Sequence, residues 1–467
     1  MKNNINLKNY KINLYTKVVF YLGISFVLIL DYYPILSIIS LLFSLFLVIK
    51  FIEELGEKIA IRELITFIAA LQWLIAPVFS YRYLPHNSYT APYLMMVSEN
   101  EYFSYVLPAM ILFYIGLNLT IKNKNINKKK YSHLINTKLD GTFGKKLIII
   151  SIITSIISPV IPVSLSFLVF LLENLKYVGL YYILFSDLPK KLVWVLITLG
   201  GLLISSVSQG MFHELLLWGG FYFLIISFHK VFSIKKRFLY FTIGFFLLLV
   251  IQSIKGDYRE ETWHGTTKNK YELFSSLSLS RIYNPLSLFN YNNVNGYLVR
   301  FNQGWIISRI MSHVPSVQPY AMGATLYEDF IDAIIPRILS SDKALVVSNL
   351  KFDQYTGLTL SSSTSMQLSS VGEAYANFGK WGGMVIMLLW GLLLNIVLNF
   401  IENKSEFFPE LLLWTPFLFL QVVKAETDLG TAINHLVKAS IVTFIILYPR
   451  FKKYYRLSKS KLNNVAL

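Results

Sequence analysis

Two arginines and a histidine lie close together in the run Arg300-Phe-Asn-Gln-Gly-Trp-Ile-Ile-Ser-Arg-Ile-Met-Ser-His313. If residues 302–313 are helical, Asn302, Arg309 and His313 fall on one face, because residues three or four apart are neighbours on a helix. Such a face offers a guanidinium fork to a phosphate, beside an imidazole that can move protons. An amphipathic helix with a solvated polar edge has the same pattern, and the spacing alone favours this second interpretation.

A second candidate is the run Ile335-Pro-Arg-Ile-Leu-Ser-Ser-Asp-Lys343, which carries two further cations. Pro336 restricts the backbone, and Arg337 with Lys343 has the charge to neutralise a diphosphate from a loop at a membrane surface. An interfacial loop whose cations meet lipid headgroups accounts for the same residues equally well.

A carboxylate, Glu373, lies in the run Ser370-Val-Gly-Glu-Ala-Tyr-Ala-Asn-Phe-Gly379, directly before a long apolar stretch. A carboxylate with a raised pKa at the edge of a membrane can serve as a general base. However, Ser370 and Glu373 also have the spacing of a capping box, in which Glu373 satisfies amide donors at a helix start. The residues alone favour the cap.

Two more ionisable groups, His435 and Lys438, are three residues apart and therefore share a helix face. Such groups below a membrane surface are costly unless they are paired or hydrated, so we expect a functional role for them. Lys424 lies near a helix end and can instead extend its amine to the interface. His213 and Glu214 occupy another external turn, where polar interfacial contacts explain them equally well.

The scaffold that positions these side chains is expected to be a membrane domain. The chain has 467 residues, of which 54% are hydrophobic and 15% charged, too apolar for an ordinary soluble protein. The apolar residues form stretches of about twenty, the length that crosses a hydrocarbon core. We therefore predict an all-α polytopic membrane protein with about 12 transmembrane helices. The expected spans are 14–30, 33–50, 63–81, 102–121, 146–162, 164–186, 191–207, 212–228, 237–254, 380–401, 408–424 and 431–448.

The distribution of positive charge predicts the orientation of these spans. With the N-terminus in the cytoplasm, most of the 43 Lys and Arg residues lie on the cytoplasmic side, whereas the short external loops carry only Arg82. We expect both termini in the cytoplasm. The net charge of +17 is therefore a topology signal and does not indicate nucleic-acid binding.

The predicted organisation has four parts. Helices 1 to 9 occupy residues 1–254, an extracytoplasmic loop or cap occupies 255–379, helices 10 to 12 occupy 380–449, and a basic cytoplasmic tail occupies 450–467. The loop mixes aromatic residues, prolines and short amphipathic runs, so we expect short helices packed on the membrane domain. The chain has no cysteine, no Walker or dinucleotide glycine motif and no paired-histidine motif, so no disulfide, nucleotide or metal cofactor is indicated.

In these same segments the chain resembles the Wzy-type O-antigen and oligosaccharide repeat-unit polymerases of bacterial membranes. The order and spacing of short motifs carry the resemblance, which covers most of the chain. The family often has an aromatic residue and a Lys-Pro pair after its Pro-Arg element, and this chain departs from that pattern because Ser341-Asp342-Lys343-Ala344 lacks the second proline. The motifs are Arg300-x-Asn-Gln-Gly-Trp305, Ile-Pro-Arg337 followed by Asp342-Lys343, Gly-Glu373-Ala-Tyr-x-Asn-Phe-Gly379, and Asn434-His435-x-x-Lys438.

The resemblance implies an enzyme of the bacterial cytoplasmic membrane that polymerises undecaprenyl-diphosphate-linked oligosaccharide repeat units on the outer face. It implies a role in O-antigen, capsule or other surface polysaccharide synthesis, with no nucleotide sugar and no required metal. A flippase and a chain-length regulator are the expected protein partners. A glycan ligase with the same donor and a repeat-unit flippase are the alternatives, although a large one-sided loop and no evident repeat weigh against transport.

The expected roles follow from the charge that the reaction develops. Breaking the bond between a sugar and a diphosphate places negative charge on the leaving oxygen, which preorganised cations stabilise. Arg300, Arg309 and Arg337 are the candidates for this role, with Lys343 and Lys438 as secondary cations.

An acceptor hydroxyl benefits from a base within hydrogen-bond reach. Glu373 is the first candidate for this base, and His313 or His435 is the next. Further side chains of the same segments are expected to bind substrate: Asn302, Gln303, Tyr375, Asn377, Lys424 and His213.

Overall fold

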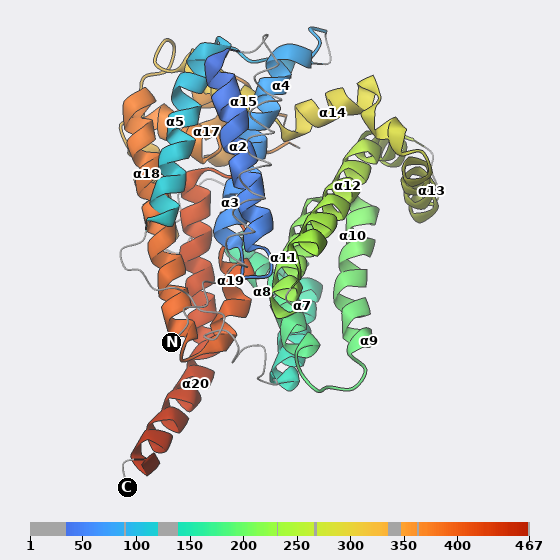
Figure 1. Cartoon of the computed structure of the whole chain (residues 1–467), viewed down its shortest axis with the longest axis vertical. Helices are drawn as coiled ribbons and strands as arrows, with labels where there is room; N and C mark the ends of the chain where they lie inside the picture. The colour runs from blue at the N-terminus through green and yellow to red at the C-terminus, as the bar shows by residue number, and fades with distance from the viewer. Residues whose placement is uncertain are drawn as a thin grey trace, which may run out of the picture.

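A computed structural model describes residues 34–87, 90–119, 139–230, 232–265, 269–334, 347–361 and 364–465. Across these ranges the regular elements are helices, and none is a strand (Figure 1). The all-α class expected from the sequence is therefore confirmed for the described part of the chain. The expected first span, 14–30, lies outside it.

Eight helical segments in the described ranges are long and apolar enough to cross a membrane. They include both halves of the region interrupted by Pro159 and Pro162, which the sequence predicts as two separate spans. The eight segments are Ile35–Glu54, Ile61–Tyr83, Gly141–Val160, Val163–Leu184, Lys191–Gln209, Ile234–Trp263, Ser370–Ser405 and Leu429–Lys452.

The expected eleventh span, 408–424, is not one continuous helix. It contains the 3-10 helix η9 (Pro409–Trp414) and the short helix α19 (Thr415–Leu418), and residues 419–424 are not helical. Pro409 and Pro416 each lack an amide donor and favour helix starts, which explains the interruption.

Helices α5 (Glu99–Asn118) and α18 (Ser370–Ser405) lie side by side along much of their length (Figure 1). Their backbones touch at two glycines. A Cβ on Gly116 would lie 2.4 Å from the carbonyl oxygen of Leu388, and a Cβ on Gly391 would lie 2.4 Å from that of Phe113. Small residues at the crossing thus permit the close backbone contact that is typical of membrane helix pairs.

The end of the bundle where the C-terminal helix α20 (Leu429–Val465) departs is fastened by Arg450. Its guanidinium donates to both Glu410 oxygens, at 2.8 and 2.7 Å, and to Asp140 at 2.9 Å. Asp140 also caps helix α7 (Gly141–Ile157) by accepting from the main-chain amide of Thr142 at 3.1 Å. Three segments distant in the sequence are therefore joined by one side chain.

Short helices lie between α12 (Ile234–Arg259) and α18, at the end of the bundle shown at the top of Figure 1. We call this the cap end. Helix α15 corresponds to the helix predicted over 302–313, but it starts two residues later. The short helices are α13 (Lys270–Tyr283), η7 (Pro285–Phe289), α14 (Tyr291–Phe301), α15 (Gly304–His313), α16 (Ala324–Ile334) and α17 (Val347–Thr356).

Candidate functional site

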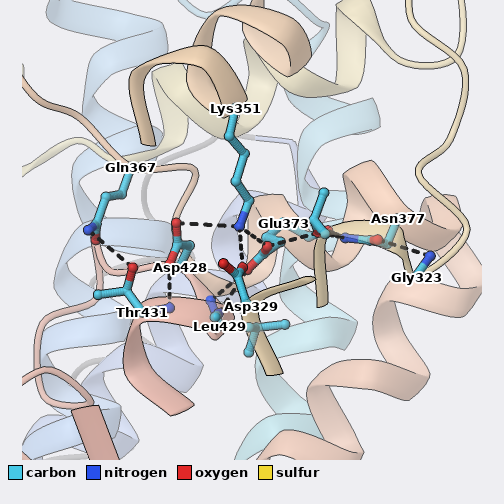
Figure 2. A network of polar contacts seen from close by, with 11 residues as sticks. Gly323, Asp329, Lys351, Gln367, Glu373, Asn377, Asp428, Leu429 and Thr431 are labelled. Atoms are coloured by element: carbon cyan, nitrogen blue, oxygen red, sulfur yellow. Dashed lines mark hydrogen bonds and ion pairs between the residues drawn. The ribbon is translucent and has the colours of Figure 1, made fainter. Parts of the chain in front are cut away.

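Glu373 is completely buried near the start of α18, and both of its carboxylate oxygens have partners (Figure 2). Oε1 accepts from the Thr325 hydroxyl at 2.9 Å and forms an ion pair with Lys351. Oε2 accepts from the main-chain amides of Leu429 at 2.7 Å and Gly430 at 3.3 Å. Glu373 therefore satisfies the first amides of α20, where negative charge is favoured by the helix dipole.

The capping-box interpretation of Ser370 and Glu373 is wrong about which amides Glu373 satisfies. The residue that precedes α18 is Ser369, and its side chain caps no amide. The Glu373 carboxylate reaches another helix, α20, because the two helix starts lie together in the fold. Sequence spacing reveals only local partners, so it could not distinguish these two roles.

Lys351 lies among three carboxylates. Its ammonium is 2.7 Å from Asp329 Oδ2 and 3.6 Å from Asp428 Oδ2, in addition to the ion pair with Glu373. Burial alone would lower the pKa of Lys351, but the attraction of Glu373, Asp428 and Asp329 raises this pKa above its ordinary value. The lysine therefore stays protonated and joins α16, α17, α18 and the start of α20.

Asn377 extends this network toward the loop before α16 (Figure 2). Its side-chain amide donates to Thr325 Oγ1 at 2.8 Å, and its side-chain oxygen accepts from the amide of Gly323 at 3.0 Å. Tyr375 is also largely buried, with its ring 4.9 Å from that of Tyr105. These contacts give both residues a positioning role in the structure, while their expected substrate contacts stay predictions.

A separate group of cations meets where α12 approaches α14 at the cap end. Lys255 and Arg259 are one turn apart on α12, and Lys255 interacts electrostatically with Arg259 and with Arg300 of α14. Arg300 Nη1 donates to the carbonyl oxygen of Gln252 at 2.6 Å, which fixes its guanidinium against α12. Arg259 is held by the carbonyl oxygen of Gly210, 2.9 Å from its Nε.

The turn before α20 and the start of α11 (His213–Lys230) complete this group. His213 Nδ1 lies 3.8 Å from Glu426 Oε1, and the imidazole interacts electrostatically with Lys424 and Lys255. The His213 side chain is 50% exposed, so it is accessible from outside the protein. We call His213, Lys255, Arg259, Arg300 and Lys424 the cation cluster.

The cation cluster has excess positive charge. Its four cations face two nearby carboxylates, Glu426 and Glu214. In the described ranges, neither Lys255 nor Lys424 forms an ion pair, whereas Arg450 elsewhere in the bundle has two carboxylate partners. Guanidinium and ammonium groups collected in this way suit an anion with two or more charges, such as a diphosphate.

The structure does not join Arg309 to Arg300. Arg309 lies on α15, where burial lowers the pKa of its guanidinium, and its Nε has no hydrogen-bond partner within the described residues. His313 is at the end of the same helix, and a Cβ on Gly357 would lie 2.9 Å from its ring. Arg337 and Lys343 lie outside the described residues.

The expectation that Asn302 shares a face with Arg309 and His313 is also wrong. Asn302 follows the last residue of α14 and lies before α15, and its side chain donates to Ser80 Oγ at 2.9 Å. The residue is buried among the membrane helices because the chain turns there. Gln303 begins the next helix from the same turn.

His435 and Lys438 meet around one aromatic ring. The Lys438 ammonium lies 4.8 Å from the centre of the Phe167 ring, and the His435 ring lies 6.0 Å from it at a steep angle. His435 is fully buried, and its Nε2 is within 2.9 Å of the Phe417 carbonyl oxygen. This environment makes His435 part of the helix packing.

In the cation cluster, the sequence motifs did not indicate Lys255 and Arg259, nor the neighbouring carboxylate Glu426. The only signal in the sequence is the position of Lys255 and Arg259 after a long apolar run, which is common for cations at a membrane surface. Sequence reasoning identified Glu373 but missed its partners Lys351, Asp329 and Asp428, because these contacts join segments far apart in the chain.

Comparison with known protein families gives a match over residues 75–452 to a domain of unknown function (DUF8712). The matched range contains both the Glu373 network and the cation cluster. No curated protein and no solved structure matches the chain.

Proposed function

The chain belongs to the DUF8712 family, and from its own geometry we propose that it is a membrane glycosyltransferase with an undecaprenyl-diphosphate-linked glycan as donor. The observation that supports this proposal is the cation cluster, in which Lys255 of α12 and Arg300 of α14 meet at the cap end of a helical membrane protein. A lipid-linked diphosphate lies at the level where such helices end, with its chain in the hydrocarbon region.

The reaction needs stabilisation of the leaving diphosphate. The bond between the anomeric carbon and the diphosphate oxygen breaks, its electron pair stays on that oxygen, and an acceptor hydroxyl bonds to the anomeric carbon. Cations that are already held in place stabilise the departing charge without reorganisation. Arg300 and Arg259 are fixed by carbonyl oxygens, and this meets the requirement.

The hydroxyl proton needs an acceptor near these cations. His213 is half exposed, lies beside Lys255 and Lys424, and faces Glu426, so it can take the proton and share the resulting charge with a carboxylate. Glu373 stays a prediction for this role, but both of its oxygens have partners within the protein. We therefore assign His213 as the base in the proposed reaction.

The acceptor in this proposal is the next lipid-linked repeat unit, so the product is a longer lipid-linked glycan. The motifs that resemble the Wzy-type polymerases support repeat-unit polymerisation over transfer to another acceptor. The charge distribution supports a location in the bacterial cytoplasmic membrane with both termini in the cytoplasm, so that the cap end faces outward.

The test is polymer formation by the purified protein in detergent with lipid-linked repeat units extracted from the cells that produce it. We expect glycans of several repeat units by gel electrophoresis and mass spectrometry. Lys255→Gln, Arg259→Gln and Arg300→Gln should each lower the rate by roughly a hundredfold, the usual cost of removing one transition-state donor. Lys270→Gln is the matched control, because this partly exposed lysine at the cap end donates to the Ser208 carbonyl oxygen and forms no ion pair among the described residues.

Two results would overturn the proposal. Polymer at the wild-type rate in all three cluster variants would show that the cation cluster does not handle the diphosphate. Movement of lipid-linked units across vesicles by a protein that makes no polymer in detergent would indicate a flippase, since a detergent solution has no second leaflet.

A further inference from the structure

The turn from Arg300 to Gln303 fastens the cap to two membrane helices. On one side, Arg300 donates to the carbonyl oxygen of Gln252 at 2.6 Å. On the other side, the main-chain amide of Gln303 donates to the carbonyl oxygen of Gln72 at 3.1 Å. The turn therefore lies directly between α12 and the span Ile61–Tyr83.

The contact at Gln72 is made in an unusual part of that span. Residues Leu71–Ile75 form the π-helix η1 between α3 (Ile61–Ala70) and α4 (Ala76–Tyr83). A wide π turn interrupts the regular hydrogen-bond pattern and frequently marks a functional site. Here the main-chain carbonyl oxygen of Gln72 accepts from the amide of Gln303.

Four side-chain amides at this junction have an oxygen that is buried and without a hydrogen-bond partner in the described part of the chain. Asn302 shows the feature most clearly, because the residue is only 1% exposed and its nitrogen is already bonded to Ser80. A buried acceptor without a donor costs roughly 1–3 kcal/mol, so natural sites rarely keep several together. The four oxygens are Gln72 Oε1, Gln252 Oε1, Asn302 Oδ1 and Gln303 Oε1.

Acceptors without donors define the chemistry of a ligand that would satisfy them. A phosphate group supplies few donors and is repelled by amide oxygens, whereas a sugar ring carries several hydroxyl donors at neighbouring positions. Gln252 and Asn302 lie beside Arg300, which belongs to the cation cluster. A glycan whose diphosphate met the cation cluster would therefore place its first sugar close to these amides.

We propose that Gln72, Gln252, Asn302 and Gln303 form an amide subsite that accepts hydrogen bonds from the sugar attached directly to the diphosphate. This inference rests on the proposed function and adds the group that recognises the donor. The amide subsite gives preference for a glycosylated carrier over the bare diphosphate carrier, so the spent carrier leaves after transfer.

Binding of two kinds of lipid tests the amide subsite. The probes are undecaprenyl diphosphate and the same lipid carrying one glucose, galactose or N-acetylglucosamine, with affinity for the purified full chain measured by native mass spectrometry. We expect the wild type to bind at least one glycosylated lipid roughly tenfold more tightly than the bare lipid, equivalent to about one or two hydrogen bonds. Gln72→Leu and Gln303→Leu should remove this preference and leave affinity for the bare lipid unchanged.

Gln354→Leu is the matched control, because Gln354 is exposed on α17 and should keep the full preference. If a leucine variant does not fold, as judged by thermal unfolding, the longer and more flexible Gln→Met change at the same position takes its place.

Each failure has its own signature. Equal affinity of the wild type for all four lipids, or an unchanged preference in the Gln72 and Gln303 variants, overturns the amide subsite and indicates that ordered water satisfies these oxygens. No binding of any of the four lipids by the wild type overturns the proposed function itself.

Discussion

Glu373 and Lys351 form an ion pair that is closed off from solvent, with side-chain exposures of 0% and 10% (Figure 2). Lys351 belongs to the short helices of the cap end, and Glu373 belongs to the membrane helix α18. The Glu373 carboxylate also accepts from the first main-chain amide of α20. The pair therefore connects the cap to the bundle at a place where water cannot replace either partner.

We predict that Lys351→Met destabilises the protein strongly. Removing the lysine leaves Glu373, Asp329 and Asp428 close together without a cation, and breaking a buried ion pair in this way costs roughly 3–5 kcal/mol. Thermal unfolding in detergent measures the loss. Lys270→Met is the control, because it removes a partly exposed lysine without any ion pair among the described residues.

The variant Glu373→Gln separates a structural role from a role as the base. A glutamine side chain has only one acceptor oxygen, so it cannot replace the carboxylate oxygen that accepts from Leu429 and Gly430 and also keep the other one. The structural role therefore predicts a lower unfolding temperature. A catalytic role predicts normal unfolding together with loss of polymer. Normal unfolding and normal polymer formation would contradict both interpretations.

Arg450 provides a second test at the opposite end of the bundle. Its bidentate contact with Glu410 depends on the planar guanidinium, so Arg450→Lys should recover only part of the stability that Arg450→Met loses. Glu410 is 2% exposed, and without a cation its charge would be left buried, at a cost of roughly 3–5 kcal/mol. Equal unfolding temperatures for the lysine variant and the wild type would show that charge alone is sufficient.

Asp140 predicts a pH dependence. Partial burial alone would raise the pKa of Asp140, but hydrogen bonds from Thr142 and Arg450 outweigh it and lower this pKa to about 2. Because the pKa is lower in the folded state than the value of about 4 in an unfolded chain, the stabilisation is complete above about pH 4 and is lost as the pH falls through about 2. The difference in unfolding temperature between wild type and Asp140→Asn should follow this range, whereas a difference independent of pH would exclude the ionised carboxylate as its source.

The contact between α5 and α18 gives a comparison of glycines. Gly391→Ala places a methyl group against the Phe113 carbonyl oxygen, so the helices must separate, and overpacking of this kind costs roughly 1–3 kcal/mol. Gly244→Ala is the matched control, because no described atom outside its own helix lies within 4 Å of the added Cβ. A similar unfolding temperature for both variants would mean that α5 and α18 do not pack as described.

The sequence determines the class of the fold and the existence of several elements. An apolar run of about twenty residues crosses a membrane as a helix, because its backbone groups must hydrogen-bond to one another. The helical segments follow those runs. The helix considered over residues 302–313 likewise corresponds to α15, apart from its first two residues. These features depend on neighbours within a few residues, so they can be read without knowledge of the fold.

Only the tertiary structure decides which polar groups meet. Glu373 satisfies amides at Leu429 and Gly430 instead of its own helix start, and Arg300 meets Lys255 but makes no described contact with Arg309, nine residues away. The partner of a side chain depends on how helices cross and turn, which sums many weak packing contacts along the whole chain. No local pattern records that sum, and for this reason the cation cluster and the Glu373 network became visible only once the helices were packed together.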